Sequence, residues 1–194
     1  MSRIIAVENL TLDGVMQAPG RVDEDLRGGF RHGGWAHRYN DPVQARVLGE
    51  HMATHQGALL FGRRTYADFY GFWPHQTDNP VCEVLDKTEK FVASRTLTEP
   101  LPWQNSTLLP GDAVRTVVEL QREQPDRDLV VLGSGNLLQT LMRQDLVDEY
   151  LLMIHPILVG SGRRLFEGTD LGDLRLTACV PTTTGVVIAT YQRK

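Results

Sequence analysis

The stretch from Val130 to Arg143, VVLGSGNLLQTLMR, decides the fold. An apolar run stops at two glycines, Gly133 and Gly135, and then resumes with leucines at helical spacing. This order predicts a buried strand, a glycine turn and a helix. The two glycines allow two interpretations: a plain tight turn, or a turn that makes room for a ligand phosphate at the N-terminus of the helix.

Composition indicates a folded chain whose partner is a small molecule. The sequence has 194 residues, 41% of them hydrophobic, with a net charge of -4 at pH 7. This length suits one sizeable core, so we expect a single domain over residues 1–194. No basic patch indicates nucleic acid or a membrane as partner. Cys82 and Cys179 lack a paired spacing and no export signal or membrane span is visible, so we expect free thiols and a cytoplasmic location.

Strands and helices alternate through the middle of the chain. Strands are expected at residues 3–10, 58–61, 91–94, 129–132 and 150–158, and helices at residues 42–56, 63–69, 113–124 and beyond Gly135. The C-terminal runs 174–180 and 186–191 are separated by PTTTG and predict an antiparallel hairpin. The sequence therefore predicts an α/β fold with a mixed sheet covered by helices on both faces.

Three of the predicted strand ends carry residues that suit a phosphate group. Gly62 is followed by two arginines and a threonine, Ser94 is followed by Arg95, and the third end is the glycine turn at 133–135. Because the carboxyl ends of parallel strands meet at one edge of a sheet, these groups could contact one ligand. Taken singly, each is equally compatible with a solvated turn or a helix cap.

Four segments, in chain order, resemble the dihydrofolate reductase superfamily: DGV, GRRTYADF with a Trp-Pro following, KFVASRTL, and VVLGSGNLLQTLMRQDLVDEYLLMIHPILVGSGRRLF. Within it, the chain is most similar to the reductase domain of bacterial riboflavin biosynthesis, the RibD C-terminal domain, and to stand-alone reductase-like proteins. The resemblance runs from Ile4 to Tyr191. It implies a three-layer α/β/α fold with a mostly parallel sheet, and NADPH as cofactor. It assigns to the cofactor Gly62, Arg63, Arg64, Thr65, Ser94, Arg95, Gly133, Ser134, Gly135, Asn136 and Leu137.

One expected feature of dihydrofolate reductases is missing. They carry a carboxylate on the helix that precedes the strand ending at Gly62. Counting back without gaps places Arg46 near that position, with Glu50 one turn later and Asp41 at the helix start. The acid is displaced or absent, so no catalytic residue is assigned and dihydrofolate is not the expected substrate.

Candidate substrate-binding residues are Asp13, Trp35 and Glu50. Residues 11–40 form a long irregular segment, which is typical of functional or disordered chain. Its glycine pairs at 28–29 and 33–34 suit a mobile lid that places Trp35 over a flat ring, with Asp25 or Glu50 giving polar selectivity. The alternatives are that Trp35 packs into the domain and that Asp13 is an ordinary turn residue.

We expect no metal site. His51 and His55 lie four residues apart on the predicted helix, but the sequence offers no HExxH pattern and no third ligand. His155 and the Asp148-Glu149 pair are expected to be structural.

The sequence thus predicts an NADPH-dependent oxidoreductase that transfers a hydride to a small, flat heterocyclic or carbonyl-type substrate, pterin- or pyrimidine-like. One alternative is an NADPH-binding protein without turnover. Another is 5-amino-6-(5-phosphoribosylamino)uracil reductase proper, whose extra phosphate pocket could use Arg38, Arg46 or Arg163. A homodimer is expected, because the C-terminal strands include an exposed sheet edge.

Overall fold

The computed structural model describes residues 2–55, 57–76, 79–168 and 172–194. Within these residues the strands are β1 (Ile4–Thr11), β2 (Ala58–Gly62), β3 (Lys90–Ser94), β4 (Ser106–Pro110), β5 (Leu129–Leu132), β6 (Glu149–His155), β7 (Leu174–Pro181) and β8 (Val187–Arg193). The helices are α1 (Pro42–His55), α2 (Arg63–Phe72), α3 (Pro80–Lys87), α4 (Ala113–Glu123) and α5 (Gly135–Met142). None of the helices in these ranges is long and apolar enough to cross a membrane.

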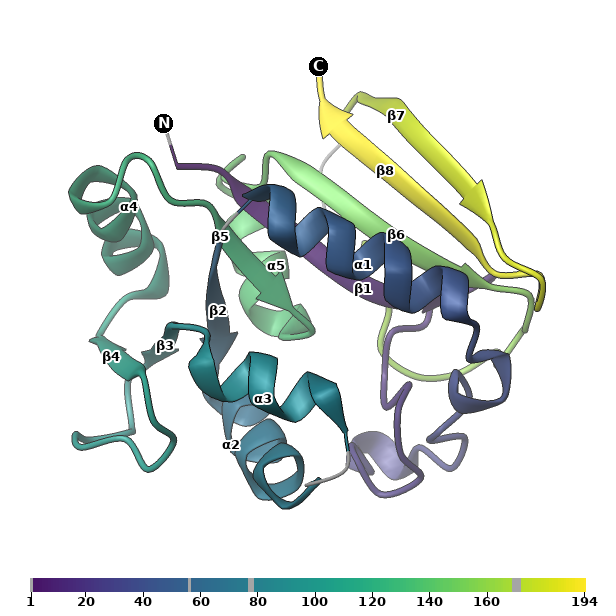
Figure 1. Cartoon of the computed structure of the whole chain (residues 1–194), viewed down its shortest axis with the longest axis horizontal. Coiled ribbons are helices and arrows are strands. Elements are labelled where there is room, and N and C mark those ends of the chain that lie inside the picture. The colour runs from purple at the N-terminus through teal and green to yellow at the C-terminus, as the bar shows by residue number, and fades with distance from the viewer. Residues whose placement is uncertain (1, 56, 77–78, 169–171) are drawn as a thin grey trace.

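The strands form one sheet in the order β4-β3-β2-β5-β1-β6-β8-β7 (Figure 1). All neighbouring pairs from β4 to β6 are parallel, whereas β8 runs antiparallel to both β6 and β7. The predicted C-terminal hairpin is therefore confirmed, with Pro181 paired to Val187 next to its turn. A mixed, mostly parallel sheet is also what the sequence predicts.

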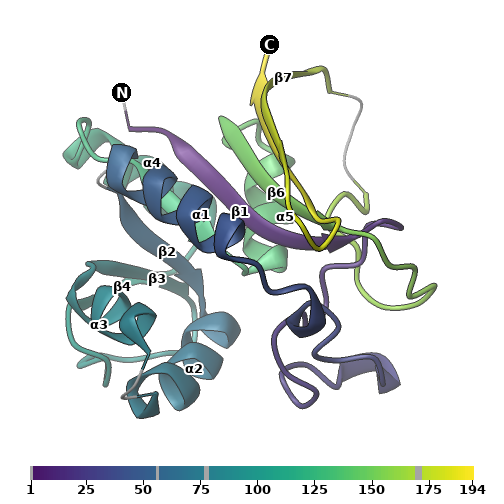
Figure 2. The ribbon, with the colours of Figure 1, turned by 45° about the vertical axis from the view of Figure 1, so that its right-hand side comes forward.

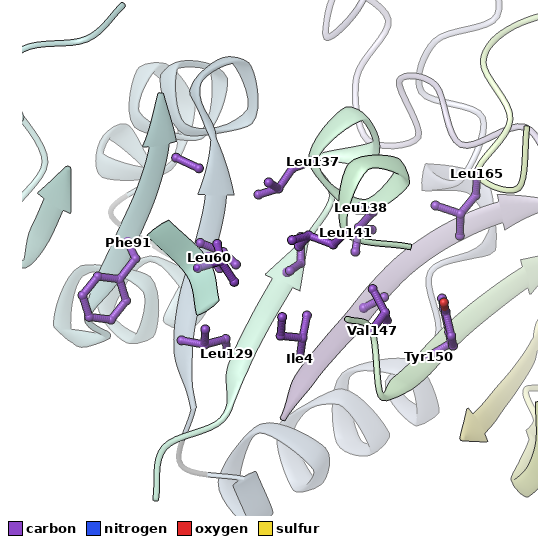
Figure 3. Packing of buried hydrophobic residues seen from close by; sticks show 14 of the residues in the cluster. Ile4, Leu60, Phe91, Leu129, Leu137, Leu138, Leu141, Val147, Tyr150 and Leu165 are labelled. Atoms are coloured by element: carbon purple, nitrogen blue, oxygen red, sulfur yellow. The ribbon is translucent and has the colours of Figure 1, made fainter. Parts of the chain in front are cut away.

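Helices cover both faces of the sheet, because successive residues of a strand point to opposite sides. On β1, Ile4 and Ala6 face the layer formed by α4 and α5, whereas Ile5 and Val7 face the layer formed by α1, α2 and α3. Figure 3 shows the first of these cores, where the leucines of α5 pack beside Ile4 and Leu60. Apolar burial on both faces stabilises the strand ends that carry the site.

Two aspartates cap the starts of helices. Asp41 Oδ1 accepts a hydrogen bond from Val43 N at 2.7 Å, and Asp112 Oδ1 accepts one from Arg115 N at 3.1 Å. Such caps satisfy backbone donors that have no partner inside the helix. Asp41 Oδ2 also accepts a hydrogen bond from Thr183 N at 2.9 Å, which ties the start of α1 to the turn between β7 and β8.

The structure contains several elements that were not predicted from the sequence, and one predicted strand is shorter than expected. Helix α3, strand β4 and the 3-10 turns Arg27–Gly29, His37–Tyr39 and Trp73–His75 were not predicted. Strand β6 ends at His155 and not at residue 158, because Pro156 has no N-H to continue the ladder. The predicted end of α1 at Gln56 lies outside the described residues.

Residues 11–40 form an ordered segment that packs on the connection after β6 (Figure 2). Its backbone bonds to this connection, with Leu12 N donating to Ile157 O and Met16 N donating to Arg163 O, both at 2.9 Å. Four of its side chains form a small core of their own: Val15, Ala18, Phe30 and Trp35. Trp35 is thus packed inside this segment and is not exposed to solvent.

Candidate active site

A cavity of about 780 Å³, which we name the strand-end cleft, opens at the carboxyl ends of β1, β2, β3 and β5. Its walls are the first turns of α2 and α5, residues 16–19 and residues 24–27. The volume is typical of sites for small molecules and cofactors. The position is also typical, because open α/β sheets bind ligands where their parallel strands end.

The turn between β5 and α5 joins three strand ends in the cleft. Gly133 has φ +65° and Ser134 has φ +61°, so two successive residues adopt the left-handed conformation. Gly133 N donates to Val7 O of β1 at 3.3 Å, and Ser134 Oγ accepts from Gly62 N of β2 at 3.0 Å. A left-handed serine is unfavourable and persists only where the surroundings hold it, which is frequent at binding sites.

The two glycines of this turn serve different purposes. A Cβ on Gly133 would lie 3.3 Å from Thr65 Cγ2 and would adopt a backbone conformation that side chains disfavour. A Cβ on Gly135 would collide with Sδ and Cε of Met16, whose side chain fills the space beside the N-terminus of α5. Because methionine is unbranched and flexible, this side chain can move when a ligand enters.

Guanidinium groups line the cleft. Arg63 and Arg64 open α2, and Arg95 follows β3. The wall on the side of residues 24–27 carries Arg27, paired with Asp25, and Arg163. Burial, and secondly Arg27, lowers the pKa of Arg163. A cluster of planar cations at helix N-termini suits phosphate oxygens.

Ser94 is the exception among the residues that the resemblance assigns to the cofactor, because it does not line the cleft. Its Oγ accepts hydrogen bonds from Thr96 N and Leu97 N, both at 3.1 Å. This arrangement closes the turn after β3 and holds Arg95 at the cleft. The Ser94 side chain therefore positions Arg95, which lines the cleft.

Five carboxyl residues line the same cleft: Glu8, Glu24, Asp25, Asp68 and Asp112. Of these, only Asp25 was named from the sequence as a candidate for substrate contact, and no such role was assigned to Glu8 or Glu24. Glu8 of β1 is 4% exposed, and within the described residues its Oε1 is buried with no hydrogen-bond partner. Glu24 Oε2 accepts from Gly20 N at 2.7 Å and from Arg21 N at 3.1 Å. Burial raises the pKa of both groups, and that of Glu8 rises to about 8. The cleft thus places cations and protonatable acids in one cavity.

The model of the RibD C-terminal domain family matches residues 3–188 of the chain. The chain belongs to the RibD C-terminal domain family. The uncharacterized protein YyaP of Bacillus subtilis (strain 168) is 29% identical over 113 residues, and the alignment covers 56% of this chain and 58% of YyaP. The chain therefore matches little more than half the length of this curated relative.

Solved structures show that this RibD C-terminal domain has the dihydrofolate reductase-like fold. A pyrimidine reductase-like protein from Corynebacterium diphtheriae superposes with a TM-score of 0.68 at 12% identity, covering 100% of this chain and 92% of that one. Dihydrofolate reductase from Enterococcus faecalis, complexed with NADP(H), superposes with a TM-score of 0.62 at 14% identity, covering 99% and 96% of the two chains. The fold predicted from the resemblance is confirmed.

The structure brings together the cofactor candidates of this RibD C-terminal domain. All of them except Ser94 line the strand-end cleft, namely Gly62, Arg63, Arg64, Thr65, Arg95, Gly133, Ser134, Gly135, Asn136 and Leu137. They come from β2, α2, β3 and the turn into α5, which are far apart in the sequence. Their role toward a cofactor stays a prediction.

Asp13 lies outside the cleft and holds a loop. Its carboxylate accepts hydrogen bonds from Val159 N at 3.1 Å, Gly160 N at 2.8 Å and Thr11 Oγ1 at 2.7 Å. The hydrogen bond from Thr11, aided by the two backbone N-H groups, lowers the pKa of Asp13 to about 2. This geometry corresponds to the turn residue that was the alternative in the sequence, and it does not support contact with a substrate.

Trp35 is also not a lining residue, because it is 5% exposed and packs inside the 11–40 segment. Its Nε1 donates to Gln17 O at 2.8 Å, and its ring meets the buried His155 edge-on at a centroid distance of 5.1 Å. The wall that this segment gives to the cleft consists of residues 16–19 and 24–27. The structure therefore supports the packing alternative for Trp35.

Glu50 lies on the exposed side of α1, where it pairs with Arg46 at 3.1 Å. Neither residue lines the cleft, so α1 does not provide the missing acid. The carboxyl group of Glu8, on β1, lines the cleft instead. The sequence signal for Glu8 is weak, because β1 also contains the polar residues Asn9 and Thr11.

His51 and His55 do not emerge as a metal site. His51 Nε2 lies 2.6 Å from Glu149 Oε1, and the side chain of His55 is outside the described part of the structure. Among described residues, no group of three or more histidine, cysteine, aspartate or glutamate side chains could hold a metal ion. Cys82 and Cys179 are free thiols.

Proposed function

We propose that this protein is an NADPH-dependent oxidoreductase that reduces a small, flat heterocyclic or carbonyl-type substrate in the strand-end cleft. The observation that carries the proposal is the combination, in one cavity, of cations on two strand ends with the buried Glu8 of β1 and the half-buried Glu24. Membership of the RibD C-terminal domain family supports it.

The residues of the cleft fit a phosphorylated dinucleotide. In the described part of the chain, Arg63, Arg64 and Arg95 form no ion pair with a carboxylate, so their charges are available to ligand phosphates. The turn at Gly133 would hold the pyrophosphate, because it presents backbone without a side chain at the N-terminus of α5. When bound, the dihydronicotinamide would supply a hydride to the substrate.

Cofactor preference tests this assignment. NADPH should bind more tightly than NADH by about 1.5 to 3 kcal/mol, which is roughly 10- to 150-fold, because the additional phosphate meets charged donors. Titration calorimetry at fixed ionic strength measures both dissociation constants. Arg95→Gln should remove much of the difference, whereas Arg122→Gln, an exposed residue of α4, should leave it unchanged. Equal affinities in the wild type would contradict the assignment.

A binding protein without turnover is the second candidate, because the helix α1 lacks the acid of dihydrofolate reductases. Loss of NADPH absorbance with a panel of cyclic imines, ring ketones and pyrimidinones separates the two candidates. Steady oxidation with any acceptor supports the reductase, whereas saturable binding with no oxidation supports the binding protein.

A phosphoribosylated uracil derivative is the substrate alternative that one observation favours. Of the three arginines considered for a second phosphate, only Arg163 lines the cleft, next to Arg27. Arg46 pairs with Glu50, and Arg38 lies over the ring of Tyr39. The reduction of 5-amino-6-(5-phosphoribosylamino)uracil therefore belongs in the acceptor panel.

We also propose a homodimer formed through β7. This strand is the last of the sheet, and its side chains are exposed along most of its length, with Leu176 52% exposed. An open edge carries unpaired backbone groups, and two identical edges can satisfy one another around a two-fold axis.

Sedimentation velocity at micromolar concentration should show the dimer. Leu176→Lys should shift the wild-type dimer toward monomer, because it places like charges across the interface. Val84→Lys, at a 56% exposed apolar residue of α3, is the matched control and should remain dimeric. A monomeric wild type would contradict the proposal.

A further inference from the structure

Glu8 is a buried carboxyl whose burial has no structural explanation within its strand. Its neighbours Ala6 and Leu10, on the same face of β1, belong to the apolar core under α4 and α5. No residue in the described ranges offers a hydrogen bond to Glu8 Oε1. An unpaired buried polar group destabilises a protein, because it gives up its hydrogen bonds to water without replacing them. Because Glu8 also lines the cleft, a bound ligand can form the hydrogen bond that Glu8 Oε1 does not make within the described part of the protein.

The position of Glu8 relative to the turn at Gly133 is fixed by strand pairing. Val7 pairs with Leu132 across β1 and β5, and Gly133 N donates to Val7 O. Glu8 therefore lies beside the turn proposed to hold the dinucleotide. A substrate that meets the cofactor at this end of the cleft would also meet the Glu8 carboxyl.

The charges that face Glu8 favour its protonated form. Burial, and secondly the nearby Glu24, raises the pKa of Glu8 to about 8. Glu24 is held by the backbone of Gly20 and Arg21, and Arg21 is itself paired with Asp68. At neutral pH the carboxyl thus carries a proton that it can give away.

We propose that Glu8 is the proton donor of the reduction. This inference rests on the proposed reductase function and names the acid that α1 does not supply. The double bond of a C=N or C=O acceptor is broken, its carbon receives the hydride that NADPH supplies, and its heteroatom receives the proton of Glu8. The acceptor would be reduced by two electrons, bound NADPH would supply them with the hydride and become NADP⁺, and Glu8 would be left as a carboxylate that regains a proton from solvent.

A matched pair of acceptors tests the proton directly. The cyclic imine 3,4-dihydroisoquinoline, in its neutral form, needs a proton with the hydride, whereas N-methyl-3,4-dihydroisoquinolinium needs the hydride alone. Glu8→Gln keeps the size of the side chain and removes the acid. It should lower kcat for the neutral imine by about 100-fold or more, the usual contribution of a general acid, and should leave kcat for the methylated iminium near the wild-type value.

Two further variants complete this experiment. Glu8→Asp retains an acid and should recover part of the activity on the neutral imine, and Glu50→Gln, outside the cleft, should behave as wild type. Equal losses on both acceptors would show that Glu8 is structural and would overturn the inference. If the wild type binds NADPH but oxidises it neither with these two acceptors nor with any member of the acceptor panel, the reductase function fails, and the inference fails with it.

A measurement in the absence of cofactor tests whether Glu8 holds a proton in the folded protein. The ordinary pKa of glutamate is 4.5 and that of folded Glu8 is about 8, so the folded state binds more protons than the unfolded state between these values. The stability that this proton contributes is complete below pH 4.5 and is lost as pH rises toward 8. Urea unfolding should therefore show that wild type loses stability relative to Glu8→Gln across this range. A difference that does not change with pH would overturn the inference.

Discussion

Replacing Trp35 with alanine is expected to lower the free energy of unfolding by about 3 to 5 kcal/mol, the usual effect of deleting a buried tryptophan. The indole packs with Phe30 and Val15, and its Nε1 donates to Gln17 O. The variant would lose this apolar burial and leave the Gln17 carbonyl without its donor. Urea denaturation followed by far-ultraviolet circular dichroism measures the change.

Trp35→Phe is the matched control, because it keeps an aromatic ring and removes the indole N-H. It should lose only about 1 kcal/mol for the hydrogen bond, with a further contribution from imperfect packing. NADPH affinity, measured well below the unfolding transition, should change little in both variants, since Trp35 does not line the cleft. A strong loss of substrate turnover in a stable Trp35→Phe variant would restore the lid interpretation.

Replacing Gly133 with valine is expected to weaken NADPH binding by at least about 100-fold, or roughly 2.7 kcal/mol. A β-branched residue strongly disfavours φ near +65°, and its Cβ would press on Thr65 Cγ2. The turn would have to rearrange, and the N-terminus of α5 would move with it. Titration calorimetry with NADPH measures the loss.

Two other variants separate the causes of this effect. Gly133→Asn tolerates the left-handed conformation but still adds a side chain, so it should bind NADPH weakly while remaining folded. Gly71→Ala, at an exposed position of α2 with open space around it, should bind NADPH as wild type does. Unchanged binding by Gly133→Asn would show that the cofactor does not approach this turn.

The sheet was predictable from the sequence because most strands are short apolar runs bounded by turn residues. Strand β4 was not predicted, because it lies at a sheet edge, is half exposed and ends in Pro110. Its pattern of apolar residues is therefore weak. Helix α3 was not predicted, although Asn79 and Pro80 are typical of a helix start. Its exposed Val81 and Val84 obscure the apolar face of the helix in the sequence. Local sequence thus identifies the buried elements better than the peripheral ones.

The candidate site was also predictable from the sequence only in part. The arginines and glycines at strand ends were predictable because their chemistry is unusual at those positions. Glu8 and the packing of Trp35 were not, because both depend on which distant residues surround a side chain. Glu8 is one of three polar residues in β1, and only the tertiary structure places it beside the turn at Gly133.

Strand β1 lies in the middle of the sheet, and this has a consequence for how the chain folds. Ile4 pairs with Leu129 of β5, and Ile5 pairs with Glu149 of β6. During synthesis, β1 leaves the ribosome long before β5 and β6, so it has no native neighbour until those strands have been made. Closing such long loops slows folding, and an unpaired apolar strand is prone to incorrect association while it waits. The same strand carries Glu8, so the cleft is not complete until β5 and the turn at Gly133 have docked beside it.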